Sequence, residues 1–130
     1  MTTDLWMLVA AGLWGALIPM IYAVGRFQVP GGIKWAFGNR EAPLEVTPWV
    51  SRTVRAHSNH IENLGLFTIL VVVAHVSGKA NQLTALGAAL YFYSRIAHTL
   101  IYASGLVYLR TIAFFVGTGG EILILLQLFK

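Results

Sequence analysis

An apolar run over residues 4–25 is the feature that most constrains the fold of this chain. At about 1.5 Å per residue in a helix, the run is long enough to cross a hydrocarbon core of about 30 Å. Asp4 opens the run and its first cation, Arg26, follows it, whereas a signal peptide has a basic start and a short apolar core. The run therefore predicts a membrane-spanning helix that is kept in the mature protein.

Three further segments of the chain have the length and character of spans. Thr47 and Pro48 are typical of a helix start, with threonine as N-cap and proline as the first helical residue. Gly78 suits a helix end, because glycine readily adopts the left-handed conformation. Residues 26–47 are too rich in proline and glycine for a span and are predicted to form a loop at one membrane face. The predicted spans cover about residues 4–25, 48–77, 80–106 and 109–129.

The composition indicates a single membrane-embedded domain. Of the 130 residues, 57% are hydrophobic and 11% are charged, whereas soluble domains carry about 25% charged residues. The net charge of +4 is spread beside the apolar segments, so no basic face for nucleic acid is predicted. The chain has no cysteine, and any thiol in its chemistry must arrive with a substrate. We therefore predict an all-α integral membrane four-helix bundle.

The positions of the cations predict the orientation of the bundle. Only Lys79 and Lys130 lie at the membrane face opposite to the loop 26–47. By the positive-inside rule, this loop lies on the cytoplasmic side and both termini lie on the opposite side. The cations on the loop side are Arg26, Lys34, Arg40, Arg52, Arg55 and Arg110.

Two polar stripes are predicted on neighbouring spans. At about 100° per residue, four polar side chains of the second span fall within about a quarter of its circumference. A short turn makes the second and third spans antiparallel, so their polar halves lie at the same depth and face each other. The second span carries Arg52, Arg55, Asn59 and Glu62, and one face of the third span carries Tyr91, Arg95, His98 and Tyr102.

These stripes favour a site for an anionic ligand. A charged side chain at the bilayer centre costs on the order of 2.5–3.5 kcal/mol, so several at one depth require partners or a water-filled pocket. Near the stripes, the arginines outnumber a single carboxylate, Glu62. Arginine suits an anion site because its planar fork binds carboxylates bidentately and keeps its charge. The arginines concerned are Arg52, Arg55, Arg95 and Arg110.

A purely structural role for these charges is the first alternative. Glu62 would then pair with Arg95 or Arg55, since ion pairs within a membrane also hold helices together. The excess of arginines over carboxylates favours a ligand site instead.

A metal site is a second alternative. His57 and His60 would need His98 or Glu62 as further ligands. The first two lie about 60–180° away from the polar stripe of their own helix, and the arginines would oppose a cation. We therefore expect no metal, and expect His57 and His60 to be interfacial or hydrogen-bonded helix residues.

One motif on each of the last three spans supports a family resemblance. The motifs are Arg52-x-x-Arg55-Ala56-His57-x-Asn59-x-x-Glu62-Asn63, Arg95-Ile96-Ala97-His98-Thr99-x-x-Tyr102 and Arg110-x-x-x-Phe114-Phe115-Val116-Gly117. Together with Ala36-Phe37-Gly38-Asn39 in the first loop, they resemble the MAPEG family, the membrane-associated proteins in eicosanoid and glutathione metabolism. The combined motif is specific, although each part alone would be weak.

The resemblance implies a homotrimer of four-helix subunits that binds glutathione between adjacent subunits near the cytoplasmic face. It implies Arg110 as the catalytic residue that stabilises the glutathione thiolate, with Tyr102 as a hydrogen-bond donor. A nearby guanidinium lowers the pKa of a thiol and so raises its reactive thiolate fraction. The glutathione-binding residues implied by position are Arg55, Asn59, Glu62, Arg95, His98 and Tyr102, to which the polar stripe adds Arg52.

Two functions are therefore predicted for the same fold. The first is a membrane-bound glutathione transferase, with peroxidase activity as an addition, that detoxifies lipophilic electrophiles arriving from the bilayer. The alternative is a non-catalytic lipid-binding or scaffold protein, since the family also contains a member that presents a fatty acid to a partner enzyme. Only the first predicts that glutathione stabilises the folded protein.

Overall fold

The chain forms helices joined by short connections in a computed structural model that describes residues 1–130. No strand is present, which confirms the all-α prediction. The helices are α1 (Thr3–Phe27), α2 (Gly32–Phe37), α3 (Pro48–Val76), α4 (Gln82–Ser104) and α5 (Val107–Leu128).

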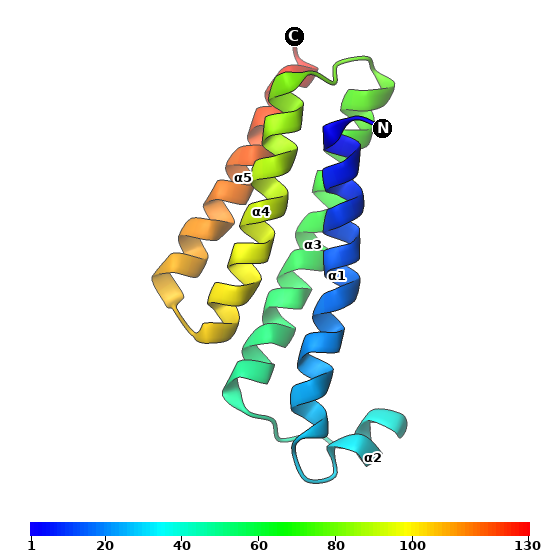
Figure 1. The fold of residues 1–130 in the computed structure, drawn as a ribbon, viewed down its shortest axis with the longest axis vertical. Coiled ribbons are helices and arrows are strands. Elements are labelled where there is room, and N and C mark those ends of the chain that lie inside the picture. The colour runs from blue at the N-terminus through cyan, green and yellow to red at the C-terminus, as the bar shows by residue number, and fades with distance from the viewer.

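The four long helices run side by side as a bundle, and α2 lies beyond the end of α1 (Figure 1). The chain passes up and down through α1, α3, α4 and α5, and its two termini lie at the same end of the bundle (Figure 1). The α4–α5 turn lies toward the other end of the bundle, the end that carries α2 (Figure 1). This arrangement agrees with the predicted order of spans.

Three of these helices, α1, α3 and α5, are long and apolar enough to cross a membrane. The helix α4 is not among them, although its 23 residues exceed the minimum of about 17 residues for a span. The prediction that residues 80–106 form a fourth span therefore stays a prediction.

The predicted loop 26–47 was wrong over its middle part, where the chain forms α2. This helix contacts α1 and no other long helix. A helix of 6 residues is well below the length of about 12 residues at which isolated helices become even marginally stable. It depends instead on tertiary contacts, such as the stacking of Phe37 on Phe27 with ring centroids 6.4 Å apart. A period of 3.6 residues is not detectable in so short a segment.

The helix ends follow the predicted signals with two differences. Thr47 occupies the N-cap position of α3 and Pro48 is its first residue, but the Thr47 side chain makes no capping hydrogen bond. The helix α4 begins at Gln82 because Asn81 and Thr84 form a capping box, a signal that the sequence interpretation missed. Gly105, with φ 88°, ends α4, and α5 begins two residues later at Val107.

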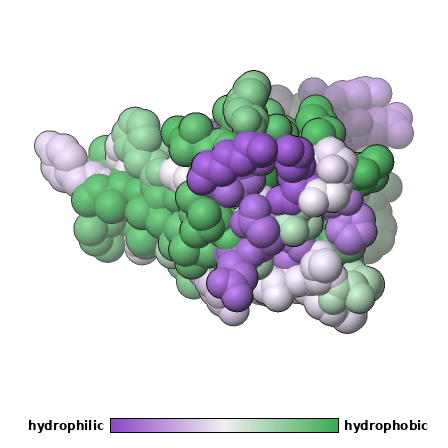
Figure 2. Space-filling model, turned by 90° about the horizontal axis from the view of Figure 1, so that it is seen from above, coloured by the Kyte–Doolittle hydropathy of each residue, from purple (hydrophilic) through white to green (hydrophobic).

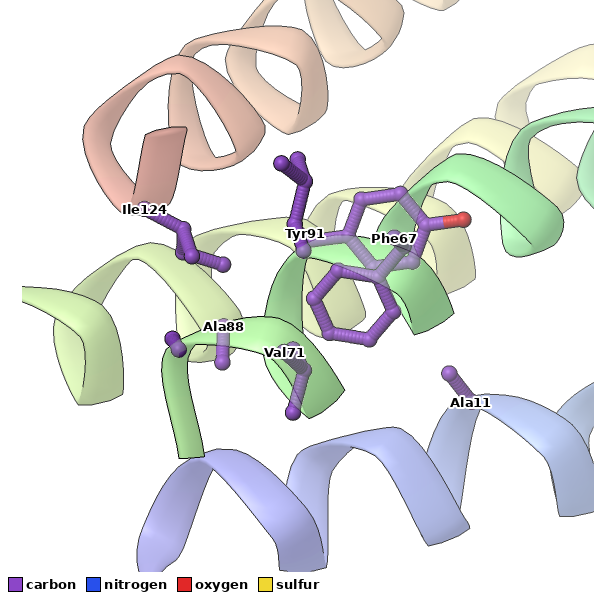
Figure 3. Packing of buried hydrophobic residues seen from close by; sticks show 8 residues of the cluster. Ala11, Phe67, Val71, Ala88, Tyr91 and Ile124 are labelled. Carbon is purple, nitrogen blue, oxygen red and sulfur yellow. The ribbon is translucent and has the colours of Figure 1, made fainter. Parts of the chain in front are cut away.

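The hydrophobic core lies between the four long helices. Phe67 of α3 and Tyr91 of α4 stack with ring centroids 3.8 Å apart, and Ala11 of α1 and Ile124 of α5 lie beside them (Figure 3). Each of these four side chains is at most 1% exposed. Because all four long helices contribute to one cluster, the bundle packs as a unit.

The backbones of α4 and α5 approach each other closely at Gly87 and Gly120. A Cβ atom added to Gly87 would lie 2.6 Å from the carbonyl oxygen of Gly120, and one added to Gly120 would overlap the carbonyl oxygen of Gly87. Glycine at both positions therefore lets the two backbones touch, as in other membrane helix pairs.

Apolar side chains cover the outside of the bundle. Seen from the end that carries the termini, polar residues gather on the end face and hydrophobic residues cover much of the visible sides (Figure 2). The exposed apolar residues include Leu13 and Leu17 of α1, Ile69 of α3, and Ile112 and Phe115 of α5. Apolar sides with a polar end are typical of a protein whose flanks contact lipid or other subunits.

Candidate functional site

An open pocket of about 320 Å³ lies where α3, α4 and α5 meet. Its walls combine polar side chains with two phenylalanines, and none of its lining residues is acidic. The lining residues are Asn59 from α3, His98 and Tyr102 from α4, and Arg110, Thr111, Phe114 and Phe115 from α5. Four of the predicted site residues, Asn59, His98, Tyr102 and Arg110, therefore share one pocket.

The tight α4–α5 turn places Arg110 over Tyr102. Gly105 allows α4 to end in a left-handed residue, and the chain reverses before Val107. The guanidinium carbon of Arg110 then lies 4.3 Å from the centroid of the Tyr102 ring. A cation over an aromatic face is stabilised by the ring, while its own N–H groups, which lie in the guanidinium plane, stay available to an anion.

Arg95 links the two predicted polar stripes. Its Nη2 donates a hydrogen bond of 2.6 Å to Oδ1 of Asn59, and its side chain is 1% exposed. Its guanidinium carbon also lies 5.7 Å from the Phe114 ring, while its Nε has no partner. This contact confirms that the polar halves of α3 and α4 face each other.

His98 lines the pocket and is buried. Its ring meets the Tyr102 ring edge-on at a centroid distance of 5.5 Å and lies 6.3 Å from the Phe114 ring. Its Nδ1 has no hydrogen-bond partner. His98 therefore packs against Tyr102 and leaves its Nδ1 without a hydrogen-bond partner.

The other predicted site residues lie outside this pocket. Arg52 is half-buried, and its Nε donates a hydrogen bond of 2.9 Å to the carbonyl oxygen of Ala103. It therefore ties the start of α3 to the end of α4. Arg55 and Glu62 are exposed on α3. Since Asn59 contacts Arg95 and Glu62 is exposed, the structure does not support the alternative in which Glu62 pairs with Arg95.

The two histidines considered as metal ligands are hydrogen-bonded to α1. His60 is fully buried, and its Nε2 donates a bond of 2.9 Å to the carbonyl oxygen of Ala11. His57 contacts the hydroxyl of Tyr22, with 3.3 Å between Nδ1 and the oxygen. No group of three or more His, Cys, Asp or Glu side chains in the chain is placed to hold a metal ion. Both residues are therefore hydrogen-bonded helix residues, one of the two roles expected from the sequence.

Several residues of the site were not predicted as such. Phe114 lies four residues after Arg110 and so occupies the same face of α5, a signal that periodicity could have given. Glu121 is buried on α5, one turn after Gly117, which packs against Arg95, and its Oε1 has no hydrogen-bond partner. The count of one nearby carboxylate, Glu62, was therefore wrong. Thr111 and Phe115 complete the unpredicted part of the pocket.

Replacing Asn59 by alanine is expected to lower the free energy of unfolding by about 1–3 kcal/mol, because buried Arg95 loses its acceptor. Asn63→Ala is the matched control, since the Asn63 amide bonds only to the carbonyl oxygen of Asn59 in its own helix, at 2.7 Å. Thermal unfolding in detergent measures both variants. If both variants lost the same free energy of unfolding, the bond between Asn59 and Arg95 would contribute no more to stability than the bond of Asn63 within its own helix.

A comparison with known proteins shows the family to which this chain belongs. The model of the MAPEG family matches residues 6–130, which include every helix except the first turn of α1. No curated protein and no solved structure matched the chain in the comparisons made. The matched range contains the three polar motifs, the pocket and, apart from the first turn of α1, the three helices that are apolar enough to cross a membrane. The chain therefore belongs to the MAPEG family, the membrane-associated proteins in eicosanoid and glutathione metabolism, and is an integral membrane protein.

Proposed function

We propose that this protein is a membrane-bound glutathione transferase that conjugates glutathione to lipophilic electrophiles. The observation that carries the proposal is the pocket in which Arg110 lies over Tyr102 without any acidic lining residue. Glutathione carries two carboxylates, one ammonium group and a thiol. A pocket with a cation and several neutral hydrogen-bonding groups suits the anionic part of such a ligand.

Arg110 is the proposed catalytic residue. Bound glutathione would lose its thiol proton to solvent, and the guanidinium would stabilise the thiolate through its in-plane N–H groups. The Tyr102 hydroxyl would donate a hydrogen bond to the same sulfur. A sulfur lone pair would then form a bond to an electrophilic carbon, and the leaving group would depart with the electron pair of the bond that breaks.

The same thiolate would reduce a lipid hydroperoxide as a second activity. The sulfur attacks the terminal oxygen, the O–O bond breaks, and the alkoxide takes a proton to become an alcohol. This leaves glutathione as a sulfenic acid. A second glutathione thiol converts the sulfenic acid to the disulfide and releases water, so that two thiols supply the two electrons.

The apolar wall of the pocket gives a lipophilic substrate access. Phe114 is half-buried in the pocket, and its neighbour Phe115 is 64% exposed on the outer surface of α5. Because α5 is one of the helices apolar enough to cross a membrane, this surface would face acyl chains. A hydrophobic electrophile would therefore enter from the bilayer and meet the thiolate at the polar end of the pocket.

A homotrimer with four spans per subunit is part of the proposal. Arg55 and Glu62 are exposed on α3, where Ile61 and Leu66 are also exposed. A charged side chain facing lipid would be costly, so these two residues are expected to face glutathione or an adjacent subunit. In this proposal, the loop 26–47 and the pocket lie on the cytoplasmic side of the membrane. A native mass of three chains per particle would support this assembly, and a mass of one chain would contradict it.

The second candidate function is lipid binding without turnover. The phenylalanines of the pocket favour it, since Phe114 and Phe115 would also accept an acyl chain. This function predicts that fatty ligands copurify with the protein and that glutathione adds no stability.

Binding of glutathione tests the choice between the two functions. We expect glutathione at about a hundred times its Kd to stabilise the detergent-purified protein by about 2.7 kcal/mol, because a ligand of the folded state alone must stabilise it. We also expect thiolate absorbance in the ultraviolet that saturates with glutathione. The matched control is the glutathione analogue with a methyl group in place of the thiol, which should stabilise without the absorbance. If glutathione produced neither stabilisation nor thiolate absorbance, the result would favour the lipid-binding function.

A further inference from the structure

A second pocket, of about 410 Å³, lies away from the proposed glutathione site. It is formed by α2 and the residues that follow this helix, at the end of the bundle opposite to the termini (Figure 1). We call it the α2 pocket. Its lining residues are Gly31, Lys34, Trp35, Gly38, Asn39, Arg40 and Glu41, and none of them lines the proposed glutathione pocket.

Two guanidinium groups are held around one indole ring at this pocket. The guanidinium carbons of Arg26 and Arg40 lie 5.1 Å and 5.4 Å from the centroid of the Trp35 ring. The ring is fixed because its Nε1 donates a hydrogen bond of 2.6 Å to the carbonyl oxygen of Ala42. Arg40 is fixed as well, since its Nη2 donates a bond of 2.9 Å to the carbonyl oxygen of Ala36. The Trp35 ring and the Arg40 guanidinium are therefore positioned by hydrogen bonds of the fold.

The charge at the α2 pocket is predominantly positive. Lys34 adds a third cation from the exposed side of α2, and Glu41 is the one acidic lining residue. The Glu41 carboxylate accepts a hydrogen bond from the amide of Asn39, at 3.5 Å. Like charges repel, so an anion among these cations would lower their electrostatic energy.

Large apolar side chains stand beside the cations. Ile33 and Phe37 lie four residues apart on one side of α2 and are 58% and 84% exposed. Phe37 also stacks on Phe27, at the end of α1, a helix apolar enough to cross a membrane. In an integral membrane protein, a short helix at the end of the spanning helices would lie near the boundary between headgroups and acyl chains.

We propose that the α2 pocket binds the phosphate group of an anionic phospholipid, whose acyl chains lie along Ile33 and Phe37. Lys34 and Arg40 would contact the phosphate from two sides, and Trp35 would sit at headgroup depth, where tryptophan is enriched. The combination of cations and exposed apolar side chains favours a lipid over a free phosphate ion. This site goes beyond the proposed transferase function and does not depend on it.

The test compares lipid binding to the purified full-length protein by native mass spectrometry. Phosphatidylglycerol and phosphatidylcholine with the same acyl chains are titrated separately. We expect tighter binding of phosphatidylglycerol, and we expect Lys34→Gln to weaken that binding about fivefold, because a cation near an anionic headgroup contributes about that factor. Lys34 is exposed, so the variant is expected to fold normally.

Lys130→Gln is the matched control, since it removes an exposed lysine at the other end of the bundle. It should leave the affinity for phosphatidylglycerol unchanged. Equal affinity for the two lipids, or equal losses in the two variants, would overturn the proposal. A third arm adds inorganic phosphate in excess. Retention of the lipid is expected, whereas its displacement would identify a site for free phosphate and also overturn the proposal.

Discussion

Arg110→Ala is expected to lower the kcat for conjugation of glutathione to an activated aryl chloride about a hundredfold, the typical effect of removing one group that stabilises a developing negative charge. The Michaelis constant for glutathione should change much less, because other residues would hold the peptide part of glutathione. Steady-state kinetics on the detergent-purified protein measures both constants. The thiolate absorbance of bound glutathione should disappear in the same variant.

The variant Arg110→Lys tests whether the positive charge alone is sufficient or whether the planar guanidinium is needed. Lysine keeps the positive charge but lacks the planar guanidinium that lies over Tyr102. We expect a rate between those of the parent and the alanine variant. If Arg110→Ala kept full turnover, the thiolate would have to be stabilised by another group, and the proposed role of Arg110 would be wrong.

Gly120→Ala is expected to lower the free energy of unfolding by about 3 kcal/mol, near the upper end of the usual cost of overpacking. The added methyl group would meet the backbone carbonyl of Gly87, and a backbone atom in a packed helix cannot move aside as a flexible side chain can. Thermal or denaturant unfolding in detergent, followed by the helical circular dichroism signal, measures the change.

Gly119→Ala is the matched control for this prediction. A Cβ atom at Gly119 has no neighbour within 4 Å, so alanine there should be neutral or should stabilise α5 by up to about 1 kcal/mol through its higher helix propensity. Equal destabilisation of the two variants would mean that the close contact of α4 with α5 does not limit stability. This contact also matters for the site, because α4 carries Tyr102 and α5 carries Arg110.

The long helices could be predicted from the sequence because their signals are local. Apolar runs of sufficient length, Pro48 at a helix start and Gly78 at a helix end each act through nearby atoms, so the predicted boundaries differ from the observed ones by only a few residues. The helix α2 could not be predicted in this way. Its six residues hold their shape through contacts with Phe27 of α1 and with the guanidinium of Arg40.

The site could be predicted only in part. The spacing of Arg95, His98 and Tyr102 on α4 is a helical period, and all three side chains indeed share one face. The same reasoning on α3 placed Glu62 with Asn59, yet Glu62 is exposed while Asn59 contacts Arg95. Periodicity defines which residues share a broad stripe, but not which edge of the stripe faces the neighbouring helix. Helix α4 packs along α3 both before and after Glu62, so the rotation of α3 about its axis decides that Asn59 faces Arg95 and Glu62 does not.

The sequence by itself determined the class of this protein: an all-α membrane protein with polar stripes on two helices, because hydropathy and helical period are properties of short segments. Only the tertiary structure decided which side chains of the site contact each other. The α4–α5 turn placed Arg110 over Tyr102, and the packing of α5 on α4 brought Gly117 of α5 against Ser94 and Arg95 of α4. Such pairings depend on helix rotation and register, which are set by contacts between segments distant in the chain, such as that between Gly87 and Gly120.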